Sequence, residues 1–179
     1  MISNKRVACL NVQRKAYLFY HGRDMYKSRL IGEFFEQEND AGEVQYLFKI
    51  NNSAIADDEV DKICLPGIDL SFRLDEYVRS GGIPYFVECC TIPDGRGDLK
   101  RFLDLVEMGF NDKFEFMLRT RAVTHHSNCY LGRTPDDTID LNKYKEWGEY
   151  QKTHFPNLPC GNYENDFHEI NKEIDHSKT

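Results

Sequence analysis

The segment His125-His126-Ser-Asn-Cys129 is the part of this sequence that most resembles a metal site. His126 and Cys129 are three residues apart, a spacing at which two side chains reach one tetrahedral zinc ion. No second pair of metal ligands with such spacing occurs elsewhere in the sequence. The six cysteines are irregularly spaced, and the sequence shows no export signal. We therefore predict reduced thiols without metal or cofactor. A small metal-dependent enzyme using His125, His126 and Cys129 stands as the alternative.

Motifs for nucleotide binding, phosphoryl transfer or acyl transfer do not occur in the sequence. It contains no Gly-x-Gly-x-x-Gly, no Gly-Lys-Ser/Thr loop, no Gly-x-Ser-x-Gly and no His-Glu-x-x-His, and it lacks the catalytic signatures of protein kinases. The acidic pairs Asp57-Asp58 and Asp136-Asp137 fall in polar turns, where solvated side chains are common. These observations favour a binding protein over an enzyme.

The only concentration of positive charge lies between residues 96 and 121. The formal net charge of −7 and the pI near 5.4 argue against a general affinity for nucleic acid, whose phosphates such a surface repels. We expect Arg96, Arg119 and Arg121 to meet a phosphate or an acidic partner, with decoration of helix faces and a nucleic-acid-associated module as the alternatives. Nucleic acid is then expected only indirectly, through a complex.

Hydropathy patterning predicts an α+β fold. Residues 15–20, 30–36 and 43–50 are predicted to form an antiparallel meander, because Val44, Tyr46, Phe48 and Ile50 alternate in the third segment. A small helical subdomain should follow. Its predicted parts are a short helix over 74–78, a helix from Asp98 to Gly109, and a helix from Asp112. The apolar run from Ile83 is either a buried strand or a buried helix from Pro84, and the proline favours the helix. Residues 129–132 are predicted to be a closing strand.

The last quarter of the chain differs in charge from the rest. Residues 1–133 carry 18 Lys and Arg against 20 Asp and Glu, whereas residues 134–179 carry 5 against 10. We predict a nearly neutral domain over 1–133 and a helical, acidic extension over 134–179. Tyr144 and Trp147 belong to an aromatic stripe in this extension that either packs on the chain's own domain or binds a partner. With no apolar run of about 20 residues, a cytoplasmic protein without membrane contact is expected.

Residues 15–133 resemble the N-terminal domain of HipA-type toxin kinases, including its stand-alone small-partner form. The order of elements carries the resemblance, and so do several short motifs. These motifs are Tyr17-Leu-Phe-Tyr-His-Gly22, Ile31-Gly-Glu33, Leu65-Pro-Gly67, Ile92-Pro-Asp-Gly-Arg96 with Asp98, Asp112-Lys-Phe-Glu-Phe-Met-Leu-Arg-Thr120, and Asn128-Cys-Tyr-Leu131. The family's glycine-rich turn after the last helix is replaced here by residues 121–126.

The resemblance implies a non-catalytic role. In HipA-type proteins this domain packs on the kinase core and does not hold the ATP site. As a separate chain it implies a bacterial antitoxin or regulatory subunit that binds and restrains a HipA-like serine/threonine kinase. The partner-binding residues that we expect are then Arg96, Arg119, Arg121, Tyr144 and Trp147.

Overall fold

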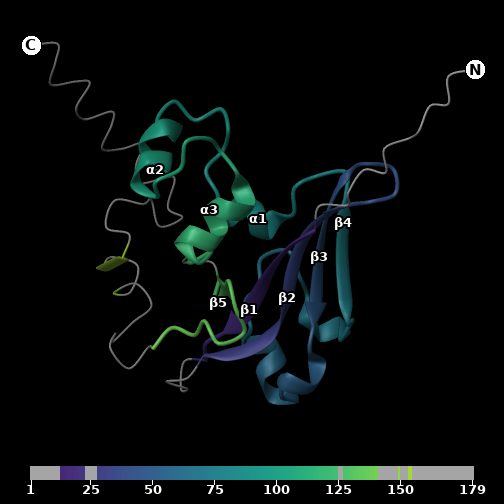
Figure 1. The fold of residues 1–179 in the computed structure, drawn as a ribbon. Helices are drawn as coiled ribbons and strands as arrows, with labels where there is room; N and C mark the ends of the chain where they lie inside the picture. Colours follow the sequence, from purple (N-terminus) through teal and green to yellow (C-terminus); the bar gives the residue numbers. More distant parts are fainter. Residues whose placement is uncertain (1–12, 23–27, 125–126, 141–148, 150–152, 155–179) are drawn as a thin grey trace, which may run out of the picture.

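The computed structural model describes residues 13–22, 28–124, 127–140, 149 and 153–154. In these residues the chain forms one antiparallel sheet with short helices gathered to one side of it (Figure 1). The strands follow in the spatial order β4-β3-β2-β1-β5. Their bounds are Arg14–Tyr20 for β1, Arg29–Glu38 for β2, Val44–Ile50 for β3, Glu76–Ser80 for β4 and Cys129–Gly132 for β5. The predicted α+β class is confirmed.

The predicted meander is confirmed as β1, β2 and β3. Phe34 pairs with Ala16 on one side and with Phe48 on the other, so that apolar side chains from all three strands share one face. The turn from β2 to β3 forms because the Asn39 side-chain oxygen accepts hydrogen bonds from the N–H groups of Ala41 and Glu43, both at 2.9 Å. This tight turn sets the pairing of β2 with β3.

The segment predicted as a helix over 74–78 is instead the edge strand β4, so that prediction was wrong. Leu47 pairs with Val78 and Phe48 with Tyr77, and the Tyr77 hydroxyl donates to the Asp69 carbonyl at 2.9 Å. Most of β4 is exposed. An exposed edge strand does not show the apolar alternation of a half-buried strand, and pairing with β3 outweighs the weak local helix preference.

Three α-helices and three short 3-10 turns complete the described fold. The helices are α1 (Tyr85–Cys90), α2 (Leu99–Leu105) and α3 (Lys113–Thr120), and the 3-10 turns are Asn52–Ala54, Asp57–Lys62 and Leu70–Phe72. The predicted helix after Pro84 is confirmed, with Pro84 as its N-cap. The predicted cap of α3 is confirmed too, because the Asp112 carboxylate accepts from the Glu115 N–H at 3.0 Å. In contrast, α2 ends at Leu105, before the predicted Gly109.

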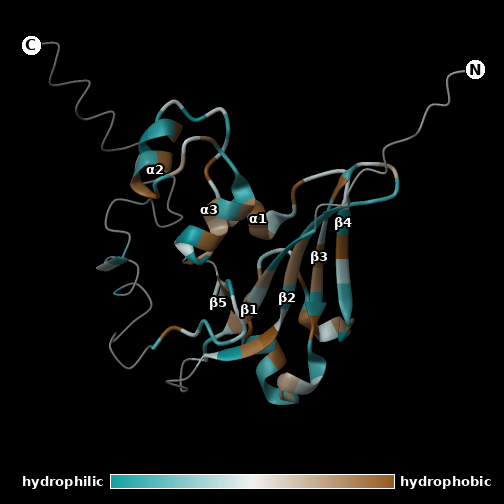
Figure 2. Cartoon of the chain, viewed as in Figure 1, coloured by the Kyte–Doolittle hydropathy of each residue, from teal (hydrophilic) through white to brown (hydrophobic). Residues whose placement is uncertain are grey.

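The main core lies between one face of the sheet and the helices α1 and α3. Phe34 is fully buried at its centre, and its ring contacts those of Phe48, Phe86 and Phe114. A second, smaller core holds α2 against α3 through side chains that include Ile92, Phe102, Leu103 and Phe116. Figure 2 shows hydrophobic stretches along the strands and on parts of each helix. The helices are therefore held to the sheet chiefly by aromatic packing.

The segment after β5 continues along the sheet. Ile139 is buried against Phe19 and Tyr130 on the face opposite the main core, and its N–H donates to the Tyr130 hydroxyl at 2.9 Å. The predicted helix containing Tyr144 and Trp147 lies outside the described residues. No helix in the described part of the chain is long and apolar enough to cross a membrane.

Candidate functional site: an arginine-lined pocket

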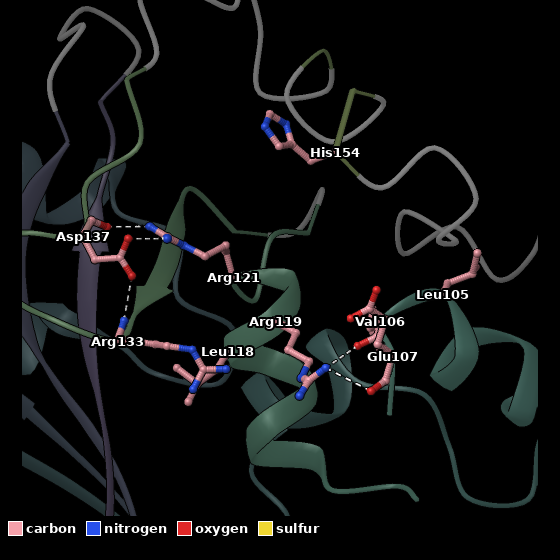
Figure 3. Close-up of a pocket in the computed structure, with 9 residues that line it drawn as sticks. All are labelled: Leu105, Val106, Glu107, Leu118, Arg119, Arg121, Arg133, Asp137 and His154. Atoms are coloured by element: carbon pink, nitrogen blue, oxygen red, sulfur yellow. Dashed lines mark hydrogen bonds and ion pairs between the residues drawn. The ribbon is translucent and has the colours of Figure 1, made fainter. Parts of the chain in front are cut away.

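A pocket of about 430 Å³ lies beside the C-terminal end of α3. Three arginines from separate places in the chain line it: one from α3, one from the residue that ends α3, and one from the residue after β5. The lining residues are Leu105, Val106, Glu107, Leu118, Arg119, Arg121, Arg133, Asp137 and His154 (Figure 3).

The end of α3 positions two of these arginines. Arg119 is on the last turn of the helix, whereas Arg121 is the C-cap in a left-handed conformation, with φ of 62°. Ala122 follows with φ of 51° and donates its N–H to the Met117 carbonyl at 2.7 Å. The Arg121 carbonyl in turn accepts from the Leu131 N–H of β5 at 2.8 Å. The change of direction at the cap lets Arg119 and Arg121 reach the same pocket.

Arg121 is paired with Asp137 across one side of the pocket. Its Nη1 lies 2.5 Å from Asp137 Oδ1, and its Nη2 donates to the Asp137 carbonyl at 2.5 Å (Figure 3). The other carboxylate oxygen of Asp137 accepts from the Arg133 N–H at 2.9 Å. Burial on its own raises the pKa of Asp137, but the hydrogen bonds from Arg133 and Arg121 outweigh it and lower the pKa below its usual value.

Arg119 and Arg133 share a single carboxylate, that of Glu115. Arg119 Nε donates to Glu115 Oε1 at 2.8 Å, and Arg133 Nη2 donates to the same oxygen at 2.6 Å. The bond from Arg133 is the main reason that the pKa of Glu115 is lowered, with Arg119 adding to it against the effect of burial. Arg119 also donates through Nη1 to the carbonyls of Val106 and Glu107, at the end of α2.

The pocket therefore holds more guanidinium donors than its carboxylates use. The arginine side chains differ in exposure, at 51% for Arg133, 37% for Arg119 and 18% for Arg121. Within the described part of the chain, Arg133 donates to a side chain only through Nη2, so its Nε and Nη1 stand without a partner. A guanidinium with free donors suits a carboxylate or phosphate group, to which it donates charge-assisted hydrogen bonds.

The predicted partner-binding residues are only partly brought together. Arg119 and Arg121 meet at the pocket, whereas Arg96 does not line it. Arg96 donates to the Asp98 carboxylate at 2.5 and 3.1 Å, and its guanidinium lies over the Phe102 ring, 4.8 Å from the centroid. Tyr144 and Trp147 fall outside the described residues.

Three members of the site were missed by sequence reasoning. Arg133 is the last residue of the predicted domain, and Asp137 belongs to an acidic pair that we assigned to a solvated turn. That assignment is wrong for Asp137, which is half-buried and ion-paired, and it holds for the exposed Asp136. The only sequence feature that points to Glu115 is its position one turn before Arg119. At this spacing a carboxylate and a guanidinium on one helix interact.

Cys129, the one candidate metal ligand among the described residues, does not line this pocket. Cys129 is fully buried on the core face of β5, and burial raises the pKa of its thiol and that of Cys90. A thiol of raised pKa is the opposite of an activated nucleophile. His125 and His126 lie outside the described residues, within which no group of three or more His, Cys, Asp or Glu is placed to hold a metal ion.

Comparison of the chain with protein-family models, with curated proteins and with solved structures gives no match.

Proposed function

We propose that this chain is a non-catalytic binding and regulatory protein whose arginine-lined pocket receives a carboxylate from an acidic segment of a protein partner. The sharing of Glu115 by Arg119 and Arg133 is the observation that carries the proposal. One carboxylate serves two guanidinium groups, and the more exposed Arg133 keeps donors for a further acid. A second carboxylate would give each of these arginines its own partner.

Partial burial favours such an exchange over a loose surface contact. The lining includes Leu105, Val106 and Leu118 beside the arginines, so part of the wall is apolar. Charge-assisted hydrogen bonds are stronger where water is partly excluded than on an open surface. An acidic side chain flanked by an apolar one fits this mixture of charge and apolar wall.

The partner class that we propose is a HipA-like serine/threonine kinase, which the chain would bind and restrain as an antitoxin or regulatory subunit. The support is the resemblance of residues 15–133 to the domain that packs on such kinases, in particular the block from Ile92 to Thr120. That block includes α2 and α3, and α3 supplies Arg119 to the pocket. The proposed role thus assigns the kinase contact to the helical side of the fold.

The test uses the full chain and the HipA-like kinase encoded beside its gene in the source genome. Titration calorimetry should show a complex with the wild-type chain, and kinase autophosphorylation should fall as the chain is added. Arg133→Glu changes an exposed side chain that is paired with Glu115 within the described chain, and it should weaken binding by about tenfold or more. The effect should grow at low salt.

The matched control is Lys100→Glu, a charge reversal of an 85% exposed side chain on α2 that does not line the pocket. It should leave the affinity for the kinase unchanged. Absence of a complex with the wild-type chain would overturn the kinase as partner. A complex that Arg133→Glu and Lys100→Glu weaken equally would overturn the pocket as its docking site.

A further inference from the structure

The two edges of the sheet differ in how far the rest of the chain covers them. The outer edge of β5 is covered, because the Leu131 N–H donates to the Arg121 carbonyl and every residue of β5 is buried. The outer edge of β4 has no neighbouring strand among the described residues, and four of its five residues are exposed. β4 is therefore an open edge, at the side of the sheet away from the arginine-lined pocket (Figure 1).

The register of β4 identifies which backbone groups point outward. The Ile50 N–H donates to the Asp75 carbonyl at 2.8 Å, so the groups of Asp75 point toward β3. Because hydrogen-bonding direction alternates along an antiparallel strand, Tyr77 and Arg79 also bond toward β3. The N–H and C=O groups of Glu76, Val78 and Ser80 then point away from the sheet, as a template for one more strand.

Most of the exposed large apolar residues are close to β4 in the sequence or lie on the neighbouring strand β3. Eight large hydrophobic residues of the described chain are exposed, and six of them lie in β4, just before or after it, or at the start of the neighbouring β3. These six are Val44, Phe72, Leu74, Val78, Ile83 and Tyr85. Figure 2 shows hydrophobic stretches within β4 beside hydrophilic ones. Open sheet edges are usually guarded by a proline, a bulge or charged side chains. β4 has no proline and no bulge, and its two charged residues, Glu76 and Arg79, lie on either side of the exposed Val78.

We propose that β4 pairs with β4 of a second copy of this chain, antiparallel, about a twofold axis through Val78. This register keeps all five residues of the strand paired and sets the outward groups of Glu76 opposite those of Ser80 in the second copy. A twofold axis perpendicular to the sheet requires that residues opposite each other in the two copies lie on the same face of the sheet. This register meets the condition, because it sets Tyr77 opposite Arg79 and Val78 opposite Val78.

The side chains of the strand are complementary to themselves in this arrangement. Val78, which is 55% exposed, meets its own equivalent on the face that also carries Leu47. On the other face Tyr77 lies opposite Arg79 of the second copy, a pair suited to a cation–π contact. Glu76, already paired with Lys49, lies opposite the neutral Ser80. No two like charges face each other, which favours a second copy over an unrelated strand.

The small size of the contact predicts a weak dimer, which forms at high protein concentration and dissociates on dilution. Stable interfaces usually bury roughly 1,200–2,000 Å² in total, more than a five-residue strand pair supplies by itself. In the proposed dimer, Leu74, which is 51% exposed and comes just before the strand, enlarges the contact. Main-chain hydrogen bonds along the edge fix the geometry.

Analytical ultracentrifugation of the full chain over a range of concentrations tests the proposal. The wild-type chain should approach twice its mass of 21.0 kDa as concentration rises. Val78→Lys places two like charges directly opposite each other and should remove the dimer, whereas Val78→Thr, which suits a strand equally well, should retain it. A wild-type chain that stays monomeric, or a dimer that survives Val78→Lys unchanged, would overturn the proposal.

A cysteine cross-link tests the register independently of any effect on folding. Directly opposed residues in a hydrogen-bonded pair have Cα atoms about 5.5 Å apart, within disulfide range. Val78→Cys should therefore give a covalent dimer under mild oxidation, and Arg79→Cys should not, because residue 79 faces residue 77. Equal cross-linking of the two variants and the wild-type chain would contradict the register. The dimer should persist in Arg133→Glu, which separates this proposal from the function of the pocket.

Discussion

Arg121 and Asp137 join the end of α3 to the loop after β5 through two contacts of 2.5 Å, one from each terminal guanidinium nitrogen. Arg121 also lies over the Tyr130 ring, 5.4 Å from its centroid. Tyr130 in turn accepts the Ile139 N–H. The pair thus ties together the helix cap, the edge strand β5 and the segment that follows it, and it forms one wall of the pocket.

Asp137→Asn should lower the free energy of unfolding by about 1.5–3 kcal/mol, since it leaves a largely buried guanidinium without its charged partner. Urea denaturation at pH 7 measures this change. Asp136→Asn is the matched control at the neighbouring exposed position, and it should stay within about 0.5 kcal/mol of wild type. The contribution of Asp137 is present above its unfolded pKa of 3.8 and is lost as pH falls through its lower folded pKa. Equal effects of the two variants would show that the pair contributes nothing.

The stability of the fold should decrease on mild acidification because of His21. Burial lowers the pKa of His21 from 6.5 to about 4. Between these values the unfolded chain binds a proton that the folded chain does not, so the free energy of unfolding falls as pH drops from 6.5 toward 4. His21→Gln should flatten the pH dependence in this window, as measured by urea denaturation at pH 7, 5.5 and 4.5. The carboxylates with lowered pKa, such as Glu115 and Asp137, are present in both proteins, so the difference between wild type and variant reports on His21. An unchanged slope in the variant would contradict the assignment to His21.

Gly32→Ala should destabilise the sheet by about 1–3 kcal/mol, because β2 and β3 approach too closely there for a side chain. A Cβ atom at Gly32 would lie 2.3 Å from the Lys49 carbonyl oxygen, which belongs to the backbone of β3 and does not move easily. Gly95→Ala is the control, since its Cβ would meet nothing within 4 Å. Chemical denaturation followed by far-UV circular dichroism compares the two variants. A smaller loss at Gly32 than at Gly95 would refute the close-approach argument.

The elements that could be predicted from the sequence are those whose burial leaves a periodic trace. In β3 the residues Tyr46, Phe48 and Ile50 of the predicted apolar face are buried, and α3 begins after an aspartate that caps it. β4 could not be predicted in the same way, because Val78 and most of its neighbours are exposed on both faces. Its strand conformation comes from pairing with β3, a contact between segments about thirty residues apart.

The residues of the candidate site also divide into those that could be predicted from the sequence and those that could not. Arg119 and Arg121 could be selected from the sequence because they lie close together in a chain that is acidic as a whole. Arg96 belonged to the same basic concentration, but its bonds to Asp98 and its contact with Phe102 keep it apart from the pocket. Arg133 and Asp137 could not be selected, since their roles come from α3 and β5 meeting at a left-handed cap.

The sequence by itself determined the α+β class, the meander, the cap of α3, and the presence of a basic concentration in an acidic chain. Local patterning is enough for these, because burial periodicity, capping and charge are properties of neighbouring residues. Only the tertiary structure decided that β4 is an open edge strand and that Arg119, Arg121 and Arg133 line one pocket. Both results depend on contacts between distant segments, and no local pattern records which distant residue will be the neighbour.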